Sequence, residues 1–185
     1  MHPFFMTFIY LSISSLGGTL ALPTARELLV PRSCQISYPT QMIEFTPLEN
    51  TFSSLTDFCI TSDTRVKHVE FGDIPATTRG ACQLEFVFPA GYSVAGPGTH
   101  QINVWKTDRP AEMNDSWATQ PKTVTTFGTV TLTSKPDREA RIIVNSGSCD
   151  SMKHFKIGLV DTRSESSVTY TQQKGVAGMR IVHSC

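Results

Sequence analysis

The stretch ACQLEFVFPAGY, Ala81–Tyr92, decides the fold class. Its apolar side chains recur at every second position, at Cys82, Leu84, Phe86 and Phe88. Alternate side chains of a strand point to the same face of a sheet. The Pro-Ala-Gly sequence that follows the run ends it with turn residues. The pattern therefore predicts a strand that packs one face on a core and places the Cys82 sulfur inside that core.

Similar short runs continue on both sides of this strand and are separated by Gly, Pro, Asn, Asp and Ser. The further candidate strands lie at residues 34–39, 42–45, 57–63, 66–75, 100–107, 127–134, 140–147, 153–161, 167–173 and 177–185. Turn signals at this spacing, without alternating helical segments, are typical of sandwiches and barrels. We expect an all-β protein, an antiparallel β-sandwich (jelly-roll-like) of about nine or ten short strands.

The chain begins with a segment of different character. An apolar run from Phe4 to Leu16 is followed by small residues, and Thr19-Leu20-Ala21 fits a signal-peptidase site. A membrane anchor is the alternative, but Ser and Gly residues interrupt the run before it reaches the length of a span. We expect a signal peptide at 1–21, a short arm or pro-segment at 22–33 and one domain at 34–185. The protein would then be secreted, with no stable membrane span after cleavage.

Export determines how the five cysteines are interpreted. Cysteines this widely spaced, in an exported chain, indicate disulfides, and five allow at most two internal bridges. Cys82 points into the core and Cys149 directly follows a candidate strand, so Cys149 is the natural candidate for its partner. Loop-closure entropy cannot choose between pairings, because it changes only logarithmically with loop length.

The chain carries no short catalytic signature. Hydrolysis of glycans needs only two carboxylates in a cleft, and the candidates on or beside strands are Glu70, Asp73, Glu85 and Asp161. Alternation places Glu70 and Glu85 on the face opposite the apolar residues, which indicates solvated charges. We therefore expect no catalytic residues.

Composition and histidine spacing exclude other classes. The 16 basic and 16 acidic residues balance, which removes the electrostatic signature of a nucleic-acid-binding protein. His68, His154 and His183 could meet from three strands, but no two histidines have the short spacing of a metal site. We expect no metal and no cofactor.

Two kinds of surface residue remain as candidates. Asn114-Asp115-Ser116 is a glycosylation sequon in a long polar loop, so we expect a glycan on Asn114. Trp105, Trp117 and Tyr170 are aromatics that can stack on a sugar ring or anchor a protein partner if they face solvent. The alternative for Trp117 is a ring folded back over the edge of the core.

Three segments together resemble a known family. FGDIPATTRGACQLEFVFP, FGTVTLTS and IIVNSGSCDSMKHFKIGL are similar to the fungal ubiquitin-3-binding protein "But-two" C-terminal domain family, over about Val66 to Cys185. The resemblance implies a secreted β-sandwich, and its cysteine pattern matches Cys82 and Cys149 as a pair. An exported chain would not meet a cytosolic ubiquitin-pathway partner, so that function is not carried over.

For the second bridge we expect Cys34 with Cys185, which would tie the ends of the domain together, and Cys59 with Cys185 is the alternative. The resulting hypothesis is a secreted, non-enzymatic β-sandwich at the cell surface, wall or host interface that binds a protein or a wall glycan. The competing hypothesis is a small secreted hydrolase that acts on glycans through paired carboxylates.

Overall fold

The computed structural model describes residues 34–47, 50–52, 55–62, 64–75, 80–149, 153–161 and 165–185. All of these residues belong to one compact unit, Arg32–Cys185. The predicted signal peptide and the arm at 22–33 lie outside the described residues. Within the described ranges, no helix has the length and apolar composition of a membrane span.

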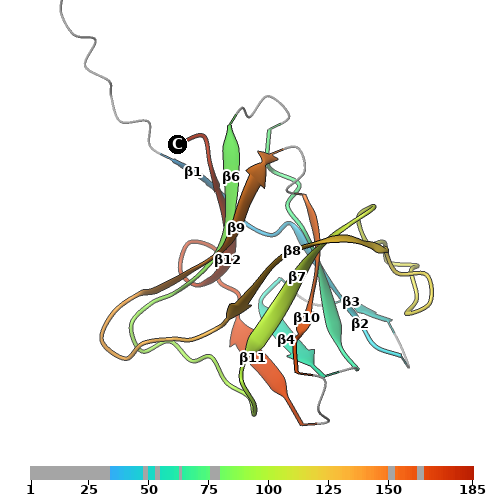
Figure 1. Ribbon diagram of the computed structural model, residues 1–185, viewed down its shortest axis with the longest axis horizontal. Helices are drawn as coiled ribbons and strands as arrows, with labels where there is room; N and C mark the ends of the chain where they lie inside the picture. Colours follow the sequence, from blue (N-terminus) through green and yellow to red (C-terminus); the bar gives the residue numbers. More distant parts are fainter. Residues whose placement is uncertain are drawn as a thin grey trace, which may run out of the picture. The chain divides into compact units, whose positions relative to one another are not determined.

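Twelve strands in the described part of the chain form three antiparallel sheets (Figure 1). The six-stranded sheet has the order β3 (Asn50–Phe52), β2 (Gln41–Phe45), β5 (Val66–Glu70), β10 (His154–Leu159), β7 (Gln101–Thr107) and β8 (Thr123–Thr131). The four-stranded sheet has the order β1 (Gln35–Ser37), β12 (Gly178–His183), β6 (Ala81–Phe88) and β9 (Ala140–Ser148). The remaining pair is β11 (Ser167–Thr171) with β4 (Asp57–Thr61).

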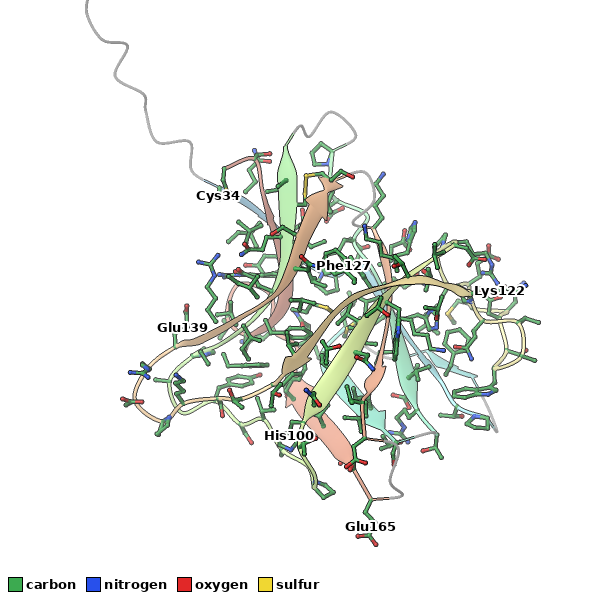
Figure 2. All side chains as sticks on the ribbon, in the orientation of Figure 1. Cys34, His100, Lys122, Phe127, Glu139 and Glu165 are labelled. Atoms are coloured by element: carbon green, nitrogen blue, oxygen red, sulfur yellow. A yellow bond between two sulfur atoms is a disulfide. The ribbon has the colours of Figure 1, made fainter. Side chains whose placement is uncertain are left out.

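The two large sheets enclose one apolar core. Strand β6 contributes Cys82, Leu84, Phe86 and Phe88, all 0% exposed, as the alternation in the sequence predicts. Ile102 and Ile157, from β7 and β10 of the other sheet, belong to the same cluster, and side chains fill the space between the sheets (Figure 2). The antiparallel β-sandwich predicted from sequence is confirmed.

The ribbon of β4 and β11 closes the core at one end. Phe58 and Ile60 of β4 and Val168 and Tyr170 of β11 are buried in the same cluster. The Tyr170 ring stacks on Phe58, with 4.4 Å between ring centroids. Strand alternation thus sends one face of the ribbon inward and leaves the face that carries Cys59 outward.

At another corner, β8 of one sheet crosses β9 of the other at close range. A Cβ atom on Gly128 would lie 2.9 Å from the Val144 carbonyl oxygen, so only glycine fits at this crossing. Asn145 Nδ2 donates to the Phe127 carbonyl at 2.6 Å beside it. The strands on either side of the 132–139 connection are therefore fastened to each other.

Two disulfides join distant parts of the chain. Cys82 is bonded to Cys149 with 4.9 Å between Cα atoms, and Cys34 is bonded to Cys185 with 4.2 Å. These are the two pairs favoured in the sequence analysis. Cys59 is the free cysteine, so the alternative bridge from Cys59 to Cys185 is absent.

Two of the differences between the expected and the observed strands have a clear physical reason. Strand β3 was not predicted, and β8 begins at Thr123 where the sequence analysis began the strand at Phe127. The early part of β8 is exposed and rich in threonine, so it has no apolar alternation to reveal it. Edge strands such as β3 and β8 depend more on their pairing partner than on their own pattern.

Candidate functional site

The candidate site lies on the outer face of the six-stranded sheet. Val104 of β7 and Ile157 of β10 point into the core, so their neighbours Trp105 and Lys156 point outward. Strand register places one residue from each of five strands in a row across this face: Ile43, His68, Lys156, Trp105 and Thr126.

Trp105 lies against the backbone of the neighbouring strand. A Cβ atom on Gly158 would be 3.3 Å from Trp105 Cζ3 and 3.5 Å from Trp105 Cη2. The same position lies 3.4 Å from Val66 Cγ1. Because Gly158 has no side chain, the indole can rest on the sheet and cover the gap. Trp105 remains partly exposed in this position.

Polar groups flank the indole. Asn103, two positions along β7, is opposite Thr129 of β8, and the Thr129 hydroxyl donates to Asn103 Oδ1 at 2.5 Å. Thr126 is the cross-strand partner of Trp105 on β8 and is exposed. The ring is thus bordered by hydroxyl and amide groups that can make hydrogen bonds with a ligand.

On the other side of Trp105, Lys156 is half-buried between Trp105 and His68. Burial lowers the pKa of Lys156 below its usual value. Its ammonium group forms no hydrogen bond or ion pair with the part of the chain that the structure describes. Lys156 is therefore a half-buried cation without an ion-pair partner among the described residues.

His68 is the buried end of the row. Its ring is 3% exposed and packs edge-on against Phe45, with centroids 4.9 Å apart. Burial lowers the pKa of His68 to about 4, and the positive charge of Lys156 acts in the same direction. The neutral ring donates from Nε2 to Gln120 Oε1 at 3.1 Å.

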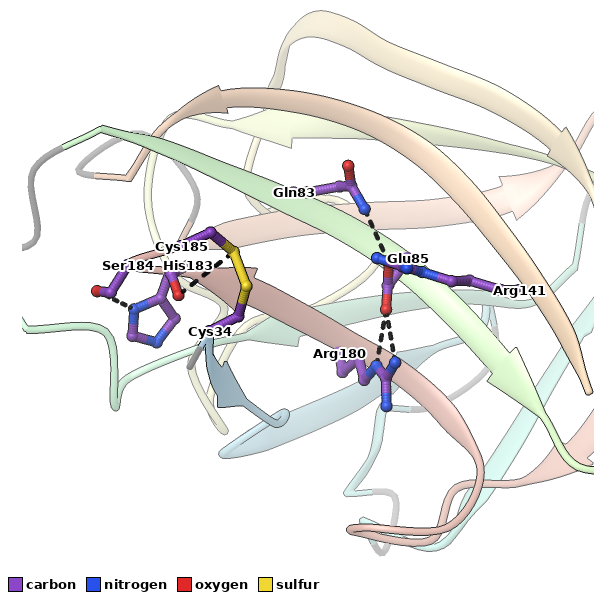
Figure 3. The surroundings of a disulfide bond; sticks show 8 residues. All are labelled: Cys34, Gln83, Glu85, Arg141, Arg180, His183, Ser184 and Cys185. Carbon is purple, nitrogen blue, oxygen red and sulfur yellow. Dashed lines mark hydrogen bonds and ion pairs between the residues drawn. A yellow bond between two sulfur atoms is a disulfide. The ribbon is translucent and has the colours of Figure 1, made fainter. Parts of the chain in front are cut away.

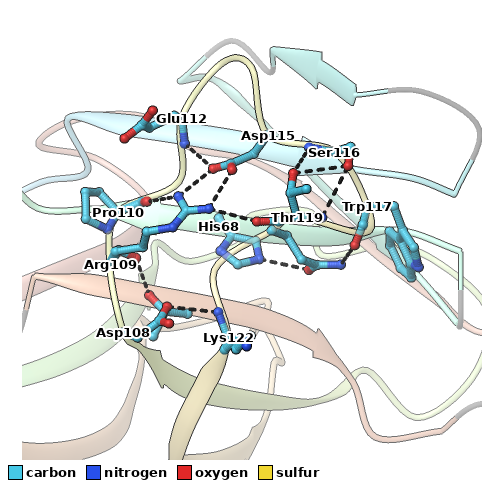
Figure 4. Close-up of polar contacts among 12 residues, drawn as sticks. His68, Asp108, Arg109, Pro110, Glu112, Asp115, Ser116, Trp117, Thr119 and Lys122 are labelled. Atoms are coloured by element: carbon cyan, nitrogen blue, oxygen red, sulfur yellow. Dashed lines mark hydrogen bonds and ion pairs between the residues drawn. The ribbon is translucent and has the colours of Figure 1, made fainter.

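Gln120 belongs to the 108–122 loop, which connects β7 to β8 and folds over His68 (Figure 4). Arg109 organises the loop: it donates to both carboxylate oxygens of Asp115, at 2.7 and 2.6 Å, and to the carbonyl of Thr119 at 2.8 Å. The pKa of Asp115 is lowered by this pairing. Asp115 also accepts from the backbone N–H of Glu112 at 2.8 Å. The long polar loop is therefore an ordered element that borders the face.

Trp117 lies in the same loop, and its indole points away from the Arg109–Asp115 pair (Figure 4). Gln120 Nε2 donates to the Trp117 carbonyl at 2.8 Å, so the backbone of Trp117 supports the side chain that holds His68. Trp117 is thus held in the loop, and Trp105 on strand β7. Trp117 is partly exposed, as is Trp105.

A small cavity lies between the loop and the sheet. His68, His154 and Ala111 are among the residues that line it, and its volume is about 10 Å³. This is room for a single water molecule, so the cavity belongs to the packing of the loop. His183 is far from it in the fold, on β12 of the other sheet, where its Nε2 lies 3.0 Å from the Ser37 hydroxyl. The three histidines therefore do not form one cluster.

Tyr170 corrects a prediction. It was expected as a solvent-facing ligand contact, but it is 5% exposed and its ring packs among the core aromatics Phe58, Phe86 and Phe88. Burial, with a smaller contribution from Tyr92, raises the pKa of its hydroxyl well above the usual value. Tyr170 shares strand parity with Val168, and this alternation is the physical reason for its burial.

Glu85 corrects a second prediction. It was expected as a solvated charge on an outer face, but its carboxylate is 0% exposed. Arg180 of β12, its cross-strand partner, donates to Oε1 at 2.8 Å, and Arg141 of β9 donates to Oε2 at 2.7 Å (Figure 3). Gln83 adds a bond of 2.8 Å to Oε2. The carboxylate is thus held by cations from both neighbouring strands.

A second depression lies beside the β4–β11 ribbon and has a volume of about 610 Å³. Its lining includes Cys59, Thr169 and Ala95, which register places side by side. Arg65 Nη1 donates to the Cys59 sulfur at 3.4 Å. The volume suits a small ligand or a short peptide segment.

Asn114 is exposed in the 108–122 loop, next to the buried Asp115. Its side chain is accessible to a glycosylating enzyme, and whether a glycan is attached stays a prediction.

Comparison with known families identifies a related family. The model described as "Ubiquitin 3 binding protein But2 C-terminal domain" matches residues 46–175, more than two thirds of the chain. The matched region begins earlier than the sequence analysis expected and therefore includes Cys59, and it stops before β12 and Cys185. Comparison with curated proteins finds no match.

Proposed function

The chain belongs to the But2 C-terminal domain family, and we propose that it is an exported, non-enzymatic binding module that recognises a glycan through the outer face of its six-stranded sheet. The observation that carries the proposal is the partly exposed Trp105 indole resting on Gly158. A sugar ring presents C–H groups that pack on an aromatic face, and an indole already seated on a rigid strand loses little entropy on binding.

The surroundings of Trp105 favour a glycan over a protein at this face. Protein interfaces are anchored by clusters of buried aromatic and apolar side chains. The exposed large apolar side chains of the described residues instead come from separate elements: Ile36, Leu55, Met113, Val124, Ile143, Val160 and Val176. Asn103, Thr126 and Thr129 supply polar groups beside the ring, the combination that recognition of hydroxyl groups requires.

Two observations support export and the absence of catalysis. Disulfides persist in oxidising compartments, and this domain contains two. Glu85, one of the carboxylates considered for hydrolysis, is bound by two arginines, and its side chain is 0% exposed. This arrangement stabilises the sheet through charge-assisted hydrogen bonds and keeps the carboxylate away from solvent.

Protein binding is the second candidate function, because the family description names a ubiquitin 3 binding protein. The depression lined by Cys59, Thr169 and Ala95 has a volume that suits a peptide segment. If this candidate is correct, substitutions along the β4–β11 ribbon should abolish binding of the protein partner, and substitutions at Trp105 should leave that binding unchanged.

The test is a pull-down of fungal wall fractions with secreted protein, followed by a glycan array. Trp105→Ala should abolish binding and Trp105→Phe should retain part of it. Tyr38→Ala is the matched control, because Tyr38 is a partly exposed aromatic outside the six-stranded sheet. Glycan binding that survives Trp105→Ala unchanged would contradict the proposal, as would the absence of binding to any glycan.

A further inference from the structure

Among the described residues, Lys156 has no ion-pair partner on the candidate face. Lys156 lies between Trp105 and His68 across the strands β7, β10 and β5. His68 is buried and neutral, since burial lowers its pKa to about 4. The next row of the face pairs Glu70 with His154, so Glu70 is opposite His154 and not opposite Lys156.

Two carboxylates near this sheet are already paired. Glu44 binds Lys67 at 2.8 Å and Arg65 at 2.9 Å. Asp115, in the loop over His68, is held by Arg109. Lys156 is half-buried, and among the described residues its ammonium group has neither a hydrogen bond nor an ion pair. Burying a cation in this way has a cost that an anionic ligand would remove.

From this juxtaposition we propose that the glycan bound at Trp105 carries an anionic group, which pairs with Lys156 while the sugar ring stacks on the indole. The inference rests on the proposed function. Directly opposed side chains on antiparallel strands have Cβ atoms about 5 Å apart, so one sugar unit can contact both. The negative group is a carboxylate, as in a uronic acid, or a phosphate ester; both offer the oxygen acceptors that an ammonium group binds.

The hydrogen-bonding groups on the far side of the ring complete the site. Asn103 and Thr129 are already bonded to each other at 2.5 Å, and Thr126 is exposed beside them. They can contact the sugar hydroxyls, which are the neutral part of the ligand. The site therefore has a cationic half at Lys156, a stacking surface at Trp105 and a neutral polar half on β7 and β8.

The experiment is isothermal titration with matched pairs of glycans. One pair is an oligogalacturonide and its methyl ester, and the other is a phosphorylated mannan oligosaccharide and its dephosphorylated form. We expect one acidic member to bind about tenfold tighter or more than its neutral counterpart, the change typical of one charge-assisted contact. The pair that shows the preference identifies the anionic group.

Variants assign the preference to Lys156. Lys156→Gln should bring the acidic ligand to the affinity of the neutral one, and Lys156→Arg should keep most of the preference. Lys174→Gln removes the same charge from the turn between β11 and β12, and should leave the preference intact. Thermal unfolding of each variant verifies that the fold is retained.

Three outcomes would overturn the inference. Equal affinity for acidic and neutral glycans, with binding that still depends on Trp105, refutes the charge requirement and leaves the proposed function standing. If Lys174→Gln reduces the preference for acidic glycans as much as Lys156→Gln does, the preference comes from the net charge of the protein and not from the site. If polyglutamate binds and its binding depends on Lys156 in the same way, the result indicates that the ligand is an acidic protein segment and not a glycan. If neither glycan pair nor any wall fraction binds, the proposed function itself fails.

Discussion

Gly158 of β10 and Trp105 of β7 fit together so closely that a Cβ atom on Gly158 would lie 3.3 Å from Trp105 Cζ3 and 3.4 Å from Val66 Cγ1. Gly158 is therefore part of the surface on which the Trp105 indole packs. Gly158→Val should displace the ring and destabilise the fold by about 1–3 kcal/mol, as overpacking does. Tryptophan fluorescence should shift to longer wavelength, and glycan binding should fall with it.

A double-mutant cycle separates the clash from other effects of the valine. In Trp105→Ala/Gly158→Val, the ring that the valine meets is gone, so the part of the stability cost that comes from the ring should disappear, and the contact with Val66 Cγ1 remains. Equal costs of Gly158→Val with and without Trp105 would show that the contact between the two residues has no energetic consequence. Chemical denaturation of the four proteins measures the cycle.

The Glu85 cluster makes a second prediction. Glu85→Gln preserves the shape of the side chain and removes its charge, leaving Arg141 and Arg180 without their anion. Charge-assisted hydrogen bonds contribute about 1.5–3 kcal/mol each, so we expect a loss of at least about 2 kcal/mol in urea denaturation. Arg141→Gln should cost less, because Arg141 is half-exposed and Arg180 still binds the carboxylate. A neutral effect of Glu85→Gln would contradict this account.

Strand β6 shows how far the sequence predicts this fold and where it stops. Alternation places Cys82 and Phe86 in the core, and the structure agrees. The same alternation places Glu85 outside, but its burial depends on arginines 56 and 95 positions away, whose register no local pattern reveals. The burial of Tyr170 could have been predicted, because Tyr170 lies two positions from Val168 on the same strand and its side chain therefore points to the same, core-facing side. The role of Gly158 could be predicted only from the register of β7 against β10, and no local sequence pattern shows that register.

The bridge between Cys82 and Cys149 makes a third prediction. Replacing both cysteines with alanine opens a loop with a sequence separation of 67 residues. The chain-entropy estimate for this loop is about 4 kcal/mol, and the loss of two buried sulfurs adds to it. Cys59→Ala is the control and should change the unfolding free energy little, because Cys59 is outside both bridges. Non-reducing peptide mapping should find Cys59 as the free thiol. A free thiol at Cys82 or Cys149 would refute the pairing.

Asn114 makes a fourth prediction. The residue is exposed in a sequon, so protein secreted from a eukaryotic host should carry an N-glycan that peptide N-glycosidase removes. Asn114→Gln should lack this added mass, and its mass should not change on treatment with the enzyme. Because the loop is held by Arg109 and Asp115, and the Asn114 side chain is not part of that pairing, the variant should unfold at the same temperature. A secreted protein without added mass would show that the sequon is not used.

His68 gives the protein a pH dependence whose sign follows from its burial. The pKa of His68 is about 4 in the folded protein and about 6.5 in an unfolded chain. Between these values the unfolded state binds the proton and the folded state does not, so stability is complete above about pH 7 and falls as the pH decreases towards 4. The shift corresponds to a loss of about 3 kcal/mol. His154, whose pKa burial also lowers, acts in the same direction.

Comparison with the variant His68→Gln isolates the contribution of His68 to the pH dependence of stability. Its side-chain amide can still donate to Gln120 Oε1, as the His68 ring does, but it does not titrate. Urea denaturation at pH 7 and at pH 4.5 should show a smaller loss of stability in the variant than in the unmodified protein. The carboxylates titrate in both proteins and cancel in the difference. An equal loss in the two proteins would mean that His68 becomes protonated in the fold without penalty, which its burial beneath Gln120 and beside Lys156 argues against.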